Sequence, residues 1–310
     1  MLMKPVVTRS LFVFVLTLSS CCWSFTVNGF LDQYDTLIDR LASPFVFLPE
    51  YHMESEVNAF LLHKNDFFRE RYLFEASMSA EIGFFSIVKT VYSFWTFNLF
   101  TGAGQKPGNT AFTVLDIDYG IDPTVEVRLS PLYIQTGVEH RCFHEVDRSE
   151  LGLIHWNRLF IGASSPNFRA ADYWKTLVVD KKWGWQDRLS WFGRAGMYPY
   201  SFFGLLGDQF LSRDNWKRFE GNVDLRYALW SRRTWMVNAR AKFMGGIWEE
   251  PDQAARYYWR TDLILESNFI RGKQGALFYL DYILDDLPLY NGLPRFSKDQ
   301  LLQVGFRFFI

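Results

Sequence analysis

Apolar and polar residues alternate one by one over much of the chain. The last nine residues place apolar side chains at every second position from Leu302 to Ile310, with Gln303, Gly305 and Arg307 among the residues between them. Successive side chains of a strand point to opposite faces, so this period of two predicts a strand with one apolar and one polar face. A soluble edge strand can alternate in the same way. The pattern gains weight because it recurs, at 115–119, 125–129, 223–229, 237–243, 259–269 and 278–282.

The polar positions of these segments are strongly charged. Between Val237 and Phe243, for example, the residues opposite the apolar set are Asn238, Arg240 and Lys242, which the core of a β-sandwich would not accept. A lipid wall on one side and a wet interior on the other would suit both faces. We therefore expect a salt-bridged interior of mixed charge rather than a wide selective pore. The inward set is Glu126, Arg128, Asp224, Arg226, Arg240, Lys242, Asp262, Glu266 and Asp281.

Composition agrees with a membrane barrel. Aromatic residues make up 19% of the chain, including 12 Trp and 15 Tyr, and barrels place such residues in girdles at the two membrane interfaces. The mean hydropathy is -0.08, and after the N-terminal region there is no apolar run long enough for a spanning helix, about 20 residues. The sequence predicts an all-β protein with a single transmembrane antiparallel β-barrel. At about 20 residues per strand and connection, we expect about 12 strands, within a range of about 10 to 14.

The N-terminus predicts export. Lys4 and Arg9 flank the apolar stretch 11–18, which has the length of a signal-peptide core and is too short for an anchor. Cleavage after Ser24 is the preferred reading, and the alternative is a lipoprotein-type cleavage that leaves a lipidated Cys21. With the first reading, Cys142 is the single cysteine of the mature chain, so no intramolecular disulfide forms. The predicted location is the bacterial outer membrane.

These signals divide the chain into three parts. We expect a cleaved signal peptide at 1–24, a periplasmic or plug segment at 25–70 and the barrel at 71–310. The net charge of -1 does not point to any partner, and the sequence has no basic stripe that would indicate nucleic acid. The expected partners are membrane lipids and, through the C-terminal strand, the barrel assembly machinery. Homodimerisation stays open.

One stretch, 132–161, carries candidate chemistry. It contains His140-Arg141-Cys142, a polar segment at 145–150, and then Trp156-Asn157-Arg158. This stretch resembles the active-site region of outer-membrane phospholipase A, in which a strand with His-x-Ser is followed by a loop and a strand with a Trp-Asn-Arg-type segment. The resemblance implies that His140 is the general base, that Asn157 orients it, and that Cys142 stands at the position of the serine nucleophile.

The alternation supports this grouping independently. Counting by twos from Ile134 places His140 and Cys142 on the lipid-facing side, and counting from Ile161 places Asn157 there too. A polar group on a lipid face is costly and tends to have a function. If the two strands form a hairpin, His140 and Asn157 become neighbours although they are distant in sequence.

The resemblance also implies a calcium ion that stabilises the oxyanion. Asp147 and Ser149 of the polar segment are the candidate oxygen donors. The chain departs from the family pattern in two respects. Cysteine replaces the serine, and Phe143 and His144 stand where the family has residues like Asn-Gly. A thiol beside a histidine can still supply a thiolate nucleophile.

Other readings stay open at this point. Lipid A deacylase barrels also use a His-x-Ser unit, and the stretch is similar to a barrel family of unknown function as well. The site is then an active lipid acyl hydrolase or a degenerate remnant of one. In the non-enzymatic reading, Cys142 is a small apolar residue, Trp156 an interface anchor and Arg158 a lumen charge. The protein would then be a structural or narrow-channel barrel.

Overall fold

The computed structural model describes most of the region after the N-terminal segment. The described residues are 45–47, 51–63, 73–88, 90–105, 112–129, 131–146, 153–168, 188–199, 217–232, 234–249, 254–271, 274–288 and 296–309. The predicted signal peptide at 1–24, including Cys21 and Ser24, lies outside these residues. So do the candidate calcium ligands Asp147 and Ser149.

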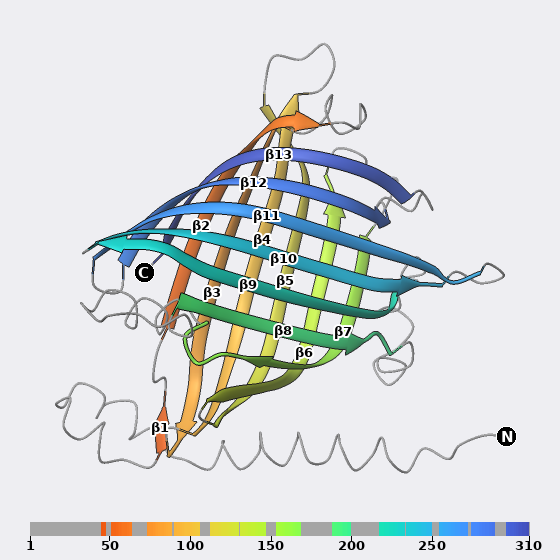
Figure 1. The fold of residues 1–310 in the computed structure, drawn as a ribbon. Helices are drawn as coiled ribbons and strands as arrows, with labels where there is room; N and C mark the ends of the chain where they lie inside the picture. The colour runs from red at the N-terminus through yellow and green to blue at the C-terminus, as the bar shows by residue number, and fades with distance from the viewer. Residues whose placement is uncertain are drawn as a thin grey trace, which may run out of the picture.

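Twelve antiparallel strands close into a barrel, as the sequence predicts (Figure 1). Each strand pairs with the next along the chain, and β13 returns to pair with β2 through Phe309↔Glu54 and the following positions. Closure matters in a membrane because it leaves no strand edge without hydrogen-bond partners. The strands are β2 (Tyr51–His63), β3 (Phe74–Ile87), β4 (Val91–Gln105), β5 (Phe112–Leu129), β6 (Leu132–Glu145), β7 (Leu153–Ser164), β8 (Leu189–Met197), β9 (Lys217–Arg232), β10 (Trp235–Trp248), β11 (Arg256–Arg271), β12 (Gln274–Pro288) and β13 (Phe296–Phe309).

The barrel begins earlier in the chain than the sequence pattern indicated. Strand β2 falls inside 25–70, the segment predicted to be periplasmic or a plug, so the barrel starts at Tyr51 rather than at residue 71. Its outward positions include Ser55 and Ala59, which weaken the apolar half of the alternation. A short additional strand, β1 (Phe45–Phe47), pairs with β3 at Phe85–Ile87, beyond the stretch of β3 that pairs with β2.

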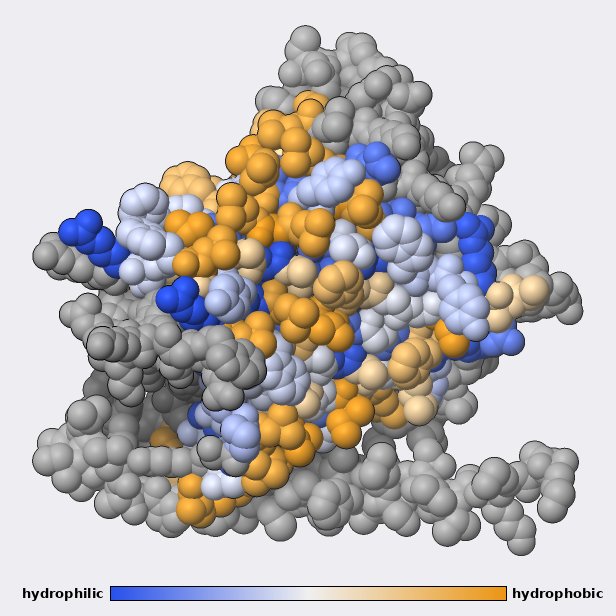
Figure 2. Space-filling model, in the orientation of Figure 1, coloured by the Kyte–Doolittle hydropathy of each residue, from blue (hydrophilic) through white to orange (hydrophobic). Residues whose placement is uncertain are grey.

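The outer wall is apolar. Large side chains exposed on it alternate with buried polar ones, as at Val223, Leu225, Tyr227 and Leu229 of β9. In Figure 2, hydrophobic residues spread over the middle of the visible wall, and most strongly hydrophilic ones lie toward the ends of the strands. Among the described residues, no helix is long and apolar enough to cross a membrane. The exposed apolar side chains of the strands form the surface that meets lipid.

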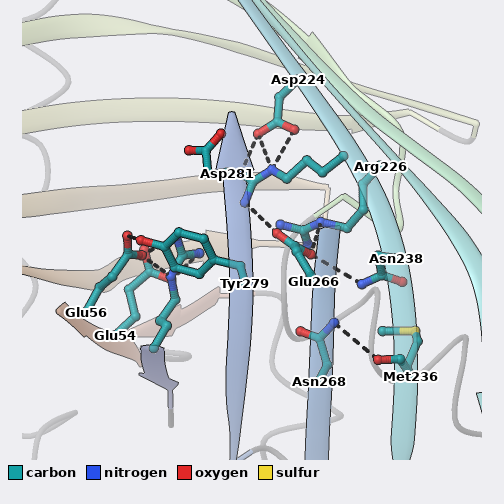
Figure 3. Close-up of polar contacts among 12 residues, drawn as sticks. Glu54, Glu56, Asp224, Arg226, Met236, Asn238, Glu266, Asn268, Tyr279 and Asp281 are labelled. Carbon is teal, nitrogen blue, oxygen red and sulfur yellow. Dashed lines mark hydrogen bonds and ion pairs between the residues drawn. The ribbon is translucent and has the colours of Figure 1, made fainter. Parts of the chain in front are cut away.

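The lumen holds the charges. Of the inward set, Glu126, Asp224, Arg226, Asp262, Glu266 and Asp281 are buried. Arg240 donates to Asp224 Oδ1 at 2.9 Å and to Glu266 Oε1 at 3.1 Å, and Arg226 pairs with Glu266 at 3.3 Å. Figure 3 shows these side chains converging from neighbouring strands. The predicted mixed-charge interior is thus a connected network of ion pairs.

A second network joins the two ends of the barrel sheet. Arg307 of β13 donates to Glu56 of β2 at 2.5 Å, and the Tyr279 hydroxyl donates to the same carboxylate. Asn58 of β2 donates to the Tyr279 hydroxyl at 3.4 Å. The seam between the first and last barrel strands is therefore held by side chains as well as by the backbone.

Aromatic rings in the lumen lie over glycines of the adjacent strand. Tyr258 faces Gly246 across β10 and β11, and a Cβ placed on Gly246 would lie 2.4 Å from the tyrosine ring carbon and 2.5 Å from the carbonyl oxygen of Phe219. Tyr279 covers Gly305 in the same way, with a Cβ at 2.1 Å from the ring. Glycine is required at these places because any side chain would occupy the space of the ring.

The connections distinguish the two ends of the barrel. At one end the links after β3, β5, β9 and β11 are tight turns, although the longer link after β7, 165–188, lies at this end too. Every link at the other end, from which β6 leads to β7, is longer than these turns, as at 146–152, 198–216 and 289–295. In outer-membrane barrels the short turns are periplasmic and the longer loops extracellular. The last residues of β6 therefore lie near the extracellular rim.

Candidate functional site

The candidate site lies on two neighbouring strands, β6 and β7. Their register sets His140 directly opposite Asn157 and Cys142 opposite His155. Nδ1 of His140 lies 2.7 Å from Oδ1 of Asn157, which is a good hydrogen-bond distance. The amide oxygen can only accept, so in this contact Nδ1 of His140 is the donor and carries a proton. The structure thus brings together the predicted base and its predicted orienting residue.

The side chains lie on the faces that the sequence predicts. Glu139, Trp156 and Arg158 are buried in the lumen, while Ile161 is 64% exposed on the outside. His140 and Asn157 occupy the alternate positions and are half-buried on the outer wall. The hydrogen-bonded pair therefore stands on the lipid-facing side, where water is scarce and an unpaired polar group would be costly.

Cys142 occupies the same outer face two residues after His140, yet the residue is only 5% exposed. Its thiol lies 3.5 Å from Nε2 of His144, the next residue on that face. Tyr119 of β5, the cross-strand partner of Cys142, places its hydroxyl 3.0 Å from the same Nε2. The tyrosine and imidazole rings stack with their centroids 5.3 Å apart. The thiol is therefore covered by a Tyr119–His144 pair.

Sequence reasoning missed this pair. His144 shares the face of Cys142 by simple counting, so a signal for it was present. Tyr119 was part of the alternating segment 115–119, but its place beside Cys142 depends on the register between β5 and β6. The register between β5 and β6 is set by the turn that joins them and by the hydrophobic patterns of both strands, and a single sequence does not reveal it.

The lumen side of the same strands is tied by ion pairs. Arg158 contacts Glu139, its cross-strand partner, and donates to Glu220 of β9 at 2.8 Å. Lys217 pairs with Glu220 at 3.1 Å, and the Tyr258 hydroxyl donates to it at 2.8 Å. These buried contacts fix β6 against β7 directly behind His140 and Asn157. The outer pair thus rests on a rigid support.

The predicted calcium site is not among the described residues, because Asp147 and Ser149 lie outside them. Within the ranges that the structure describes, no group of three or more His, Cys, Asp or Glu side chains is arranged to hold a metal ion.

The chain is similar in fold to several solved outer-membrane barrels. Outer-membrane phospholipase A of Salmonella typhi, solved as a dimer with bound calcium, is 9% identical with a TM-score of 0.47, and the match covers 92% of this chain and 96% of that one. An outer-membrane channel of Pseudomonas putida F1 is 9% identical with a TM-score of 0.47, covering 84% and 93%. LpxR of Salmonella typhimurium is 8% identical with a TM-score of 0.41, covering 84% and 99%.

No protein-family model and no curated protein matches the chain. The solved relatives include a phospholipase and a channel, so fold similarity at this level does not select a function. The closed barrel, its apolar wall and its charged lumen identify the architecture as that of a bacterial outer-membrane protein.

Proposed function

We propose that this outer-membrane barrel is a lipid acyl hydrolase of the phospholipase A type, with Cys142 as nucleophile, His140 as general base and Asn157 as its orienting partner. One observation carries the proposal: the 2.7 Å contact between His140 and Asn157 on the outer wall. A polar pair in this position has no structural need and lies where acyl chains already pack. It supports a site that acts on membrane lipid without removing it from the bilayer.

The chemistry follows from the two nitrogens of the imidazole. Asn157 holds the proton on Nδ1, so Nε2 takes the thiol proton of Cys142 as Sγ attacks the ester carbonyl. The tetrahedral intermediate collapses, the alkoxide of the lysolipid takes the proton from His140, and a thioester remains. A water molecule, deprotonated by His140, then attacks the thioester. This releases the fatty acid and restores the thiol.

The other predicted partners belong to this proposal as predictions. Membrane lipids are the substrate, and calcium, held through Asp147 and Ser149, is implied by the resemblance. Contact of the C-terminal strand with the assembly machinery is predicted by the strand pattern, and homodimerisation stays open. Activity measured with and without calcium tests the cofactor. The oligomeric state in detergent tests homodimerisation, and the assembly of C-terminal variants tests contact with the assembly machinery.

The test is fatty-acid release from phosphatidylethanolamine vesicles or micelles by the refolded full-length barrel, measured with calcium and with EDTA. The variants are Cys142→Ala, Cys142→Ser and His140→Ala. Activity in the wild type that Cys142→Ala and His140→Ala remove supports a thiol hydrolase. Silence in the wild type with activity in Cys142→Ser means a serine scaffold disabled by the cysteine. Silence in all chains rejects the proposal.

A second candidate is a structural or narrow-channel barrel, and the lumen favours it. Buried ion pairs such as Arg240–Asp224 and Arg158–Glu220 link nearby strands on the lumen side and place charges of both signs there. Conductance across a planar bilayer separates the two readings. A structural barrel gives neither hydrolysis nor steady conductance, and a channel gives conductance that Arg240→Ser increases.

A further inference from the structure

Three polar atoms meet on the outer wall beside the proposed nucleophile. Sγ of Cys142 and Nε2 of His144 are 3.5 Å apart, and Nε2 and the Tyr119 hydroxyl are 3.0 Å apart. Tyr119 is the register partner of Cys142 across β5 and β6, so its side chain lies beside the thiol on the same face. Two groups that can donate hydrogen bonds thus lie beside the one sulfur atom that the proposed function uses.

The protons that Tyr119 and His144 carry determine which of these groups donates to which. A tyrosine hydroxyl has one proton, and Nε2 of a neutral histidine either donates or accepts. When Nε2 carries the proton it donates to the tyrosine oxygen, and the tyrosine proton is then directed at Cys142. In this arrangement His144 polarises Tyr119, and Tyr119 donates to whatever negative charge develops at the thiol or next to it.

The base and these donors stand on opposite sides of the thiol. His140 precedes Cys142 on β6 and is held by Asn157 from the β7 side. His144 follows Cys142, and Tyr119 approaches from the β5 side. An acyl-transfer site needs this division, because the proton leaves toward the base while the carbonyl oxygen acquires its charge elsewhere. Donors near the position of that oxygen stabilise it most in an apolar, water-poor site.

We propose that Tyr119, backed by His144, is an oxyanion donor of this site. The inference rests on the proposed function. When Sγ bonds to the carbonyl carbon, the carbonyl π electrons move to oxygen, and the Tyr119 hydroxyl donates to the resulting oxyanion. Both donors keep their protons when the intermediate collapses. The substrate is therefore a membrane lipid, and the group that reacts is its carboxylic ester, which is uncharged before the attack.

A competing reading is that Tyr119 and His144 merely cover the thiol, which is 5% exposed. The two readings predict opposite signs. A cover obstructs the substrate, so removing the tyrosine hydroxyl leaves hydrolysis unchanged or accelerates it. An oxyanion donor is needed in the transition state, so the same change lowers kcat and affects KM little.

The experiment uses the refolded full-length barrel in detergent micelles with a phospholipid substrate and calcium throughout. Tyr119→Phe removes one hydroxyl and is compared with Tyr227→Phe, a change of the same kind on β9. The two tyrosines are matched in exposure, 39% and 38%, and both face outward. We expect Tyr119→Phe to lower kcat about 10²- to 10³-fold, the range for loss of one oxyanion donor. We expect Tyr227→Phe to behave as the wild type.

His144 is tested by rescue. His144→Gln keeps a side-chain N–H donor, so its kcat should be higher than that of His144→Ala. A lower kcat at constant KM indicates lost stabilisation of the transition state rather than unfolding. Unchanged or faster turnover in Tyr119→Phe overturns the inference. Silence of both the wild type and Cys142→Ser rejects the proposed function and the inference with it. An active wild type with an indifferent Tyr119→Phe rejects the inference alone.

Discussion

His140 and Asn157 meet at 2.7 Å on a surface that otherwise displays apolar side chains to lipid. Their contact satisfies two polar groups that would each be costly alone. The pair is therefore expected to cost the barrel stability and to be retained for chemistry. Replacing one residue of the pair, and then both, separates the effect on stability from the effect on hydrolysis.

Asn157→Leu leaves the imidazole of His140 without its amide partner, so we expect a loss of about 1 to 3 kcal/mol in the free energy of unfolding. The double variant His140→Leu/Asn157→Leu should regain that loss, because both polar groups are gone. Hydrolysis should fall in both, and His140→Ala alone should lower kcat about 10²- to 10⁴-fold. Urea titration in lipid vesicles measures the stability. A double variant less stable than Asn157→Leu would contradict the expectation.

The lumen network gives a second prediction. Arg240→Met leaves Asp224 and Glu266 buried without their shared cation, and breaking such a buried pair costs about 3 to 5 kcal/mol. The control is Arg218→Met, because Arg218 pairs with Glu249 at 2.8 Å with side chains that are 33% and 50% exposed. An exposed pair contributes about 0 to 1 kcal/mol. Equal unfolding midpoints for the two variants would show that the lumen charges are solvated.

Gly246 and Gly245 are neighbours on β10 and form a matched pair for testing whether a lumen ring requires a glycine beside it. A Cβ on Gly246 would meet Tyr258 and the Phe219 carbonyl, whereas the nearest atom to a Cβ on Gly245 is 3.5 Å away. We expect Gly246→Ala to cost about 1 to 3 kcal/mol through overpacking and Gly245→Ala to cost much less. Heat-dependent gel mobility follows the fraction folded. Similar transition temperatures for both variants would mean that the Tyr258 ring moves aside freely.

The membrane-facing wall predicts a dependence on depth. Leu265, in the middle of β11, is 51% exposed, and Tyr257, near the start of the same strand, is 76% exposed. Leu265→Arg should cost about 2 to 4 kcal/mol in a bilayer, and Tyr257→Arg about 0 to 1, because the cost of arginine falls toward the interface. Unfolding in vesicles gives both numbers. A larger cost at Tyr257 would place the membrane elsewhere on the barrel.

The sequence predicted the barrel, the strand number and the inward charges because a lipid wall and a wet lumen impose a period of two on every strand. It also predicted that His140 and Asn157 share the outer face. It did not predict β2, because Ser55 and Ala59 on the outer face reduce the contrast between the two sides of that strand. Tyr119 was not predicted because its position depends on register, which arises from pairing between strands and not from either strand alone.

The seam between β2 and β13 has a consequence for biogenesis. Glu56 and Arg307 meet across the closure although they lie near opposite ends of the chain, so one edge of β2 has no native neighbour until the last strand has been made. Contacts between such distant residues form late because closing so long a loop costs entropy. The newly exported polypeptide must therefore keep its first barrel strand available and unaggregated throughout translocation, and shortening its final strand should stall assembly at an open sheet.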